Sequence, residues 1–310
     1  MVSRQIQRTF SGADWALSTY LAVAWGSSFL FIAIAIDDLD PAVIPFGRAL
    51  FGAITLAVFP NARNSIPRQH WARIAVLGLV WMTIPFLLFP LAERSVTSGV
   101  AGMINGGLPV VMAFVTAVWV RRAPSRQRIA AVVLGFIGIS IIALPAISED
   151  STSGAAVADV RGISYLLVAV TCYACGANIA RPLQSKYPPA NLLMHVQFAA
   201  AIWALPFAFV GLQRSTFSWV STGALVSLGV LGTGVAFVAF GTLLERTGIT
   251  RAMIPTYFTP ILGLVLGAIF RGERVASLSL LGMCIVIASA WMTSKPDDRD
   301  VTLSTTSKSG

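Results

Sequence analysis

Ten long stretches of mostly apolar residues, separated by short polar segments, run through nearly the whole chain of 310 residues. A membrane-spanning helix needs about 20 predominantly apolar residues. Glycine and proline inside a stretch do not exclude a helix, because neighbouring spans can satisfy the freed backbone groups. The pattern predicts ten transmembrane helices, over residues 15–36, 41–60, 71–91, 96–119, 126–146, 160–181, 189–211, 219–243, 249–270 and 276–294.

Composition indicates that the chain is surrounded by lipid. Hydrophobic residues make up 56% of the sequence and charged residues 11%, with a mean hydropathy of +0.77. A soluble domain carries roughly 25% charged residues. Residues 1–14 lack the small-residue cleavage site of a removable signal peptide, and the polar tail 295–310 is expected to be disordered. The predicted fold class is therefore an all-α integral membrane protein.

One motif occurs twice and divides the chain into halves. Residues 93–109 are ERSVTSGVAGMINGGLP, and residues 245–260 are ERTGITRAMIPTYFTP. Each copy begins with Glu-Arg and a hydroxyl residue, continues through small and apolar residues, and ends at a proline. Upstream, the segment 25–41 aligns without gaps on the segment 173–189. A repeat on this scale indicates a duplicated structural unit.

Basic residues predict how the chain is oriented. With the N-terminus inside, 16 of the 22 Lys and Arg residues lie in inside segments and five in outside segments, and Arg48 lies within a span. This positive-inside bias places both termini in the cytoplasm. Because each repeat has five spans, the second repeat enters the membrane from the opposite side, as in transporters with a midplane binding site. The predicted parts are a cytoplasmic segment 1–14, a first five-helix repeat 15–146, an extracytoplasmic linker 147–159, a second, inverted five-helix repeat 160–294, and a cytoplasmic tail 295–310.

Several short motifs, in this order and spacing, resemble a known family. They are Trp25-Gly26-Ser27-Ser28-Phe29 in the first span, Pro45-x-x-Arg48 in the second, the duplicated Glu-Arg blocks, and Gly272-Glu273-Arg274 before the last span. Together they resemble the EamA-type proteins of the drug/metabolite transporter superfamily over roughly residues 15–294. The chain departs from the family pattern at Arg121-Arg122-Ala123, where a Gly-Glu-Arg is expected, which argues against a symmetric role for Glu273.

The resemblance implies a secondary transporter that commonly exports amino acids or other small metabolites. It also implies that helices one to four and six to nine line the pathway, with helices five and ten at the periphery. A transporter of this kind acts by alternating access in the cell (plasma) membrane. The function predicted here is therefore active or facilitative movement of a small polar metabolite, with export as the expected direction.

Arg48 is the only charged residue well inside a span. It lies ~10 Å in from Pro41 at about 1.5 Å per residue, and a charge at that depth costs several kcal/mol unless it faces water, a partner or a polar cavity. Arg48, Gly52 and Thr55 form a small-or-polar stripe on one helix face. Arg48 either binds an anionic group of the substrate or donates to helix carbonyls and holds its helix in place. No Asp or Glu lies mid-span to pair with it, which favours substrate binding.

The seventh span contains three polar candidates. Asn191 and His195 share a helix face, whereas Gln197 points nearly the opposite way, so His195 and Gln197 do not both face one cavity well. His195 has an ionisable ring and is the candidate for proton coupling. The alternative for His195 is a hydrogen-bonded packing residue.

Further candidates come from the duplicated segments. Asn105 in the fourth span needs a polar partner, and the repeat places Thr256, with Tyr257 beside it, opposite Asn105. Trp25 and Tyr173 are symmetry mates that could wall a cavity, although aromatic residues in membrane helices are more often packing or interface residues. Asn178 is a weaker candidate.

Other classes of function fit less well. An intramembrane enzyme needs a catalytic set that the spans lack, and a receptor or scaffold has no evident need for inverted repeats. Cys172 and Cys175 lie inside an apolar helix without a second ligand pair, so no metal or cofactor is predicted. The basic residues behind the net charge of +9 are scattered through short loops and do not cluster on one soluble face, so no nucleic-acid partner is predicted. The expected partners are a small-molecule substrate and the lipid bilayer, and a homodimer is one assembly that the sequence allows.

Overall fold

The computed structural model describes residues 11–121, 125–144 and 160–294, and every regular element in them is a helix. The first half contains α1 (Gly12–Ala35), α2 (Ile44–Ala57), η1 (Pro60–Arg63), η2 (Arg68–His70), α3 (Trp71–Leu77), η3 (Gly78–Thr83), α4 (Ile84–Ala92), α5 (Ser98–Asn105), α6 (Leu108–Val120) and α7 (Arg126–Ala143). The second half contains α8 (Val160–Gln184), α9 (Pro189–Leu212), α10 (Trp219–Gly229), η6 (Val230–Val235), α11 (Ala236–Thr247), α12 (Ile249–Ala252), α13 (Ile254–Arg271) and α14 (Ser277–Ser294).

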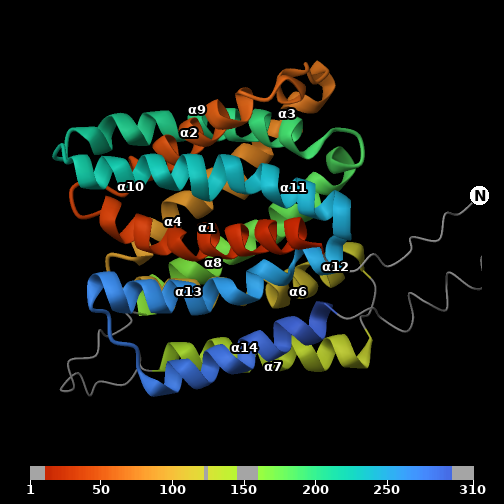
Figure 1. Ribbon diagram of the computed structural model, residues 1–310, viewed down its shortest axis with the longest axis vertical. Coiled ribbons are helices and arrows are strands. Elements are labelled where there is room, and N and C mark those ends of the chain that lie inside the picture. Colours follow the sequence, from red (N-terminus) through yellow and green to blue (C-terminus); the bar gives the residue numbers. More distant parts are fainter. Residues whose placement is uncertain (1–10, 122–124, 145–159, 295–310) are drawn as a thin grey trace, which may run out of the picture.

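These elements confirm the ten predicted spans. Among the described residues, seven helical stretches are long and apolar enough to cross a membrane, and the segments 44–57, 129–143 and 277–292 form three shorter apolar helices. Their axes run alongside one another to form a bundle (Figure 1). The second span is shorter than predicted, because its helix ends at Ala57 and a 3₁₀ turn begins at Pro60. The predicted disordered tail lies outside the described residues.

Two of the predicted spans are broken, each within one copy of the duplicated motif. The fourth span breaks between Asn105 and Leu108, and the ninth breaks at Met253. Each break is followed by a proline in the first turn of the next helix, Pro109 in α6 and Pro255 in α13. Proline suits a helix start but disfavours helical backbone in the residue before it. Broken helices of this kind frame substrate sites in repeat-built transporters.

A second pair of interruptions also follows the repeat. The π-helical segments η3 and η6 lie in the third and eighth spans. In each, a threonine hydroxyl donates to the carbonyl five residues earlier: Thr83 to Gly78 at 2.9 Å and Thr233 to Leu228 at 2.9 Å. Single-turn π-helices occur frequently at functional sites.

Helices of each repeat pack against helices of the other repeat. Helix α2 of the first repeat packs on α9 and on η6, and α9 of the second repeat packs on η3. The hydroxyl of Thr83 reaches across to donate to the Ala200 carbonyl at 3.1 Å. Helices α7 and α14 pack mainly on each other at one edge of the bundle (Figure 1).

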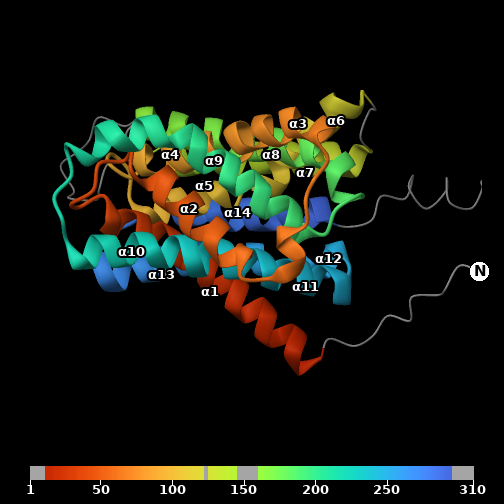
Figure 2. The ribbon, with the colours of Figure 1, turned by 90° about the horizontal axis from the view of Figure 1, so that it is seen from above.

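The buried core differs between the two ends of the bundle, which we name the Gly12 end and the Asp37 end after the residues that lie there. Towards the Asp37 end, one large apolar cluster joins residues of α1, α2, α4, α5, α6, α7, α8, α10 and α14. Towards the Gly12 end, the core divides into one cluster built on α2, α3, α8 and α9 and another built on α1, α11 and α12. Figure 2 shows the N-terminal half of α1 leaning away from the other helices. The buried apolar core is therefore continuous at the Asp37 end, which we call the sealed end, and divided at the Gly12 end.

Candidate functional site

A pocket of about 230 Å³ lies between the two repeats, where the core of the Gly12 end meets the core of the Asp37 end. Residues of both repeats line it, and it reaches towards the Gly12 end through Met112 of α6, Ala177 of α8 and Met253 beside α13. Pockets for drug-sized ligands measure about 300–1,000 Å³. This pocket therefore suits a smaller metabolite.

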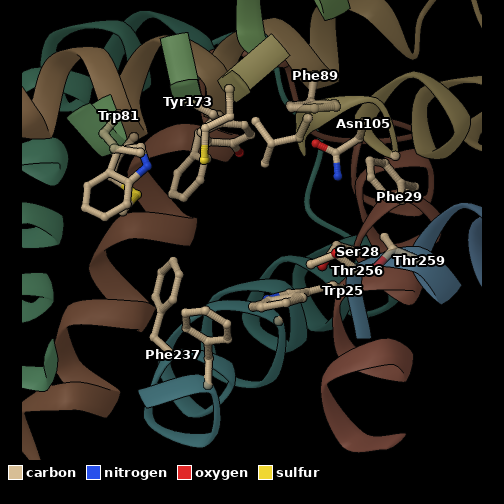
Figure 3. A pocket seen from close by; sticks show the side chains of 18 of the residues that line it. Trp25, Ser28, Phe29, Trp81, Phe89, Asn105, Tyr173, Phe237, Thr256 and Thr259 are labelled. Carbon is tan, nitrogen blue, oxygen red and sulfur yellow. The ribbon is translucent and has the colours of Figure 1, made fainter. Parts of the chain in front are cut away.

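Aromatic side chains form the walls of the pocket (Figure 3). Trp25 packs against Phe240 with ring centroids 5.6 Å apart, and Tyr173 stacks on Phe89 at 6.0 Å. All four rings line the pocket, so the two predicted symmetry mates, Trp25 and Tyr173, lie in one cavity. Trp81, Phe86 and Phe237 add further aromatic surface. Walls of this kind favour a ligand with an apolar body.

Arg48 is the single charged residue among those that line the pocket in the described part of the chain. Its side chain is buried, and its Nε donates to the Thr233 hydroxyl at 3.0 Å. The guanidinium carbon lies 4.0 Å from the centre of the Phe86 ring, a cation–π contact. Thr233 and Phe86 hold one edge and one face of the guanidinium. The terminal amino groups can then form the paired hydrogen bonds with which Arg binds a carboxylate.

The other polar groups of the pocket gather on the side formed by α1 and α13 (Figure 3). The hydroxyls of Ser28, Thr256 and Thr259 donate to carbonyls of their own helices, at 2.8, 2.6 and 3.4 Å. Since each hydroxyl hydrogen is already used, these oxygens offer lone pairs to a ligand. Asn105, at the end of α5, points towards the same space (Figure 3). This side of the pocket can accept hydrogen bonds from a donor such as an ammonium group.

The structure places three predicted residues outside the lining of the pocket. His195 bonds through Nδ1 to the Asn191 carbonyl of its own helix at 2.9 Å. Tyr257 donates to the Ala290 carbonyl of α14 at 3.3 Å, which directs it away from the cavity. Gln197 is fully buried against Gly52 of α2. The small stripe on α2 thus serves helix contact at Gly52, and only Arg48 reaches the pocket.

Asn191 and Asn178 join helices to neighbouring segments. The Asn191 amide donates to the carbonyls of Ala62 and Asn64, at 2.8 and 2.6 Å, and so fixes the turn after α2. The Asn178 amide donates to the Thr116 hydroxyl of α6 at 3.0 Å and to the Ala174 carbonyl at 2.9 Å.

Sequence reasoning missed the residues that hold Arg48 and one buried acid. Phe86 and Thr233 are 38 and 185 positions from Arg48, and no spacing rule connects them. Ser28 lies within the Trp25 motif and could have been selected with it. Glu93 opens the first copy of the duplicated motif, yet its burial appears only in the fold.

Replacement of Gln197 with Met is expected to stabilise the protein by about 1–3 kcal/mol, the cost of a buried polar group without a partner. Both polar atoms of the Gln197 amide are buried and lack a hydrogen-bond partner among the described residues, and Met has a similar shape. Thermal unfolding in detergent measures the change. A less stable Gln197→Met protein would show that the amide has a partner in another conformation.

Comparisons with known proteins decide the family. The model of the EamA-like transporter family matches residues 15–144 and 160–295, which is most of the chain. The chain belongs to the EamA-like transporter family. It is therefore a multi-pass membrane protein of a transporter family, with the ten-helix repeat fold described above.

Curated relatives of this EamA-like transporter share 22–24% of its residues. An uncharacterized transporter of Archaeoglobus fulgidus is 22% identical over 88% of this chain and 98% of the relative. A probable terminal-alkyne amino-acid exporter of Streptantibioticus cattleyicolor is 24% identical over 91% of this chain and 93% of the relative. A probable amino-acid metabolite efflux pump of Escherichia coli K12 is 24% identical over 91% of this chain and 95% of the relative.

A solved crystal structure shares the fold. It superimposes with a TM-score of 0.59 at 15% identity and covers 93% of this chain and 98% of its own. At that identity the likeness concerns the fold alone. The fold described above is thus found in an experimental structure as well.

Proposed function

We propose that this EamA-like transporter exports a small zwitterionic metabolite with an apolar body, such as an amino acid or a related compound, by alternating access. The observation that carries the proposal is the buried Arg48 guanidinium at the edge of an aromatic-walled pocket between the repeats. Arg48 would bind a carboxylate, and the acceptor oxygens of Ser28, Thr256 and Thr259 would bind an ammonium group. Two of the relatives described above bear the names of a probable amino-acid exporter and a probable amino-acid metabolite efflux pump, which agrees with this chemistry.

The alternating-access part of the proposal is supported by the difference between the two ends. A core continuous at the Asp37 end and divided at the Gly12 end is what one of two alternating states requires. We assign the Gly12 end to the cytoplasm of the plasma membrane, because most basic residues lie at that end. The pocket would then load from the cytoplasm in the conformation described.

A metabolite-export screen tests the proposed function. Cells that overproduce the protein are expected to accumulate one or a few amino-acid-like compounds in the medium, and cells that lack it are expected to retain them. Overproduction of the Arg48→Gln variant is the matched control. Identical exported metabolites in all three strains would contradict the proposal, and so would export that is unchanged by Arg48→Gln. A receptor or scaffold would give no such difference.

Single cysteines test the orientation. We expect Gln213→Cys, at the exposed turn after α9, to react with an impermeant thiol reagent added to intact cells. Asn64→Cys, at the exposed turn after α2, should react only after permeabilisation. Both variants need a background without Cys172, Cys175 and Cys284. The reverse labelling pattern would place the Gly12 end outside.

A further inference from the structure

Glu93 is a buried acid whose carboxylate has no hydrogen-bond partner in the part of the chain that the structure describes. It follows the last residue of α4, has 9% of its surface exposed, and both of its carboxylate oxygens lack a partner among the described residues. An ionised carboxylate left in this condition pays the full cost of losing its water. Burial of a neutral carboxylic acid costs much less free energy.

Glu93 lies just beyond the pocket on the sealed side. Phe86, Phe89 and Glu93 recur at helical spacing along one face of α4, and the Glu93 amide bonds to the Phe89 carbonyl one turn back at 2.9 Å. Phe86 contacts the Arg48 guanidinium, and Phe89 lines the pocket. The adjacent Ala92 and Val96 belong to the large cluster that closes the Asp37 end. A change at Glu93 therefore acts on the seal next to the pocket.

Charged groups surround Glu93 from several elements. Burial and the negative charge of Glu273 raise the pKa of Glu93 well above its usual value, and the positive charges of Arg48 on α2 and Arg271 on α13 oppose this rise without cancelling it. Arg271 is itself paired with Asp37. Arg94, the next residue in the chain after Glu93, forms an ion pair with Asp40, with Nη2 of Arg94 3.5 Å from Oδ2 of Asp40. On the α8 side, the backbone of Gly162 lies against the turn that follows Glu93.

Glu273 differs from Glu93 in its partners. It accepts hydrogen bonds from the backbone amides of Ser98 and Gly99, at 3.1 and 3.0 Å, and from the Ser98 hydroxyl at 2.9 Å. These donors belong to the first turn of α5, a favourable position for a negative charge. The negative charge of Glu273 acts on Glu93, and of these two carboxylates only that of Glu273 has donors among the described residues. Such a pair separates the roles of its members.

We propose that Glu93 is a proton-binding site, and that its protonation stabilises the conformation sealed at the Asp37 end. The inference deepens the proposed function, since it makes the closing of the Asp37 end in alternating access depend on protonation of Glu93. The neutral acid fits the dry position next to the pocket, whereas ionisation requires water and so favours opening of the Asp37 end. By linkage, the sealed state gains stability at low pH and loses it as the pH rises through the pKa of Glu93 in that state. Protons would enter the site from the Asp37 side.

Infrared difference spectroscopy tests whether Glu93 holds a proton. The purified protein at neutral pH is expected to show the carbonyl stretch of a protonated carboxylic acid, which disappears on titration to alkaline pH. Glu93→Gln should lack this band. Glu245→Gln is the matched control, because Glu245 opens the second copy of the motif but is exposed, and the band should persist in it. A band that persists in Glu93→Gln, or no band in the unaltered protein, would overturn the proposal.

Thiol labelling in the cysteine-free background tests the link to conformation. Leu39→Cys would report opening of the Asp37 end, since Leu39 is buried in the large cluster. The labelling rate of Leu39→Cys is divided by the labelling rate of the exposed Gln213→Cys, because this ratio cancels the pH dependence of thiol chemistry. We expect this ratio to rise by roughly tenfold between about pH 6 and about pH 9. The rise should vanish in Glu93→Gln and remain in Glu245→Gln. A flat ratio in the protein with Glu93 intact overturns the proposal even if Glu93→Gln does not fold.

Neither measurement involves a substrate or Arg48. Failure of the export screen together with a titrating Glu93 band would reject the proposed substrate class and retain the proton site. Export that depends on Arg48, together with a flat labelling ratio, would retain the function and reject the proton site.

Discussion

Replacement of Arg48 with Gln is expected to weaken binding of the exported metabolite by about ten- to a hundred-fold. A charge-assisted hydrogen bond is worth about 1.5–3 kcal/mol, and about 1.4 kcal/mol corresponds to a tenfold change in affinity. In the folded protein the Arg48 Nε is held by Thr233, which orients the rest of the guanidinium towards the pocket. Calorimetric titration with the metabolite identified by the export screen measures the change.

Two further variants separate binding from support of the fold. Arg48→Lys should restore binding only in part, because an ammonium group cannot form the planar paired contact. Thr233→Val keeps the charge and removes the acceptor of Nε, so its loss of affinity should be smaller than that of Arg48→Gln. Wild-type affinity in well-folded Arg48→Gln protein would remove Arg48 from the binding site. Misfolding of every Arg48 variant, with normal binding by the remaining folded protein, would assign Arg48 to helix support.

Replacement of Gly78 with Val is expected to destabilise the protein by about 1–3 kcal/mol or more, the cost of overpacking a close contact. Gly78 begins the π-helical segment η3, which packs on α9 of the other repeat. A Cβ there would lie 2.8 Å from the backbone nitrogen of Ala200 and 2.9 Å from the Cβ of Ala199. Backbone atoms cannot rotate away as a side chain can, so α9 would have to move. Thermal unfolding in detergent measures the loss.

Gly223→Val is the matched control. Gly223 lies in α10, and a Cβ there meets nothing within 4 Å. Its unfolding free energy should change by no more than about 0.5 kcal/mol. Equal stability of the two variants would show that the contact between η3 and α9 tolerates an added side chain, and that the repeats are not tightly joined there.

The ten spans and their grouping into repeats could be predicted because both depend on local features of the chain. Length and hydropathy define a span, and the structure confirmed each one within a few residues of its predicted ends. The breaks at Asn105 and Met253 were not predicted, although a proline follows each. Proline is compatible with either a kinked or a broken membrane helix, so neighbouring helices decide between the two.

The candidate site was predicted only in part. Arg48, Trp25, Tyr173, Asn105 and Thr256 line one pocket, as their depth and symmetry suggested. His195, Gln197 and Tyr257 lie outside its lining, because the side of a helix that faces a cavity depends on which helices pack around it. Whether the predicted residues bind a substrate stays a prediction.

The sequence by itself determined that the chain lies in a lipid membrane, how many spans it has, that it is duplicated, and which family it belongs to. Composition, the lengths of the apolar stretches and the order of the motifs are properties of the chain alone. Only the tertiary structure decided which end is sealed, which polar groups share the pocket, and that the Glu93 carboxylate is buried without a partner among the described residues. These properties arise from contacts between residues far apart in the chain. Thr233 reaches Arg48 across 185 positions, and Glu273 reaches Ser98 across 175, because the inverted repeats pack into each other.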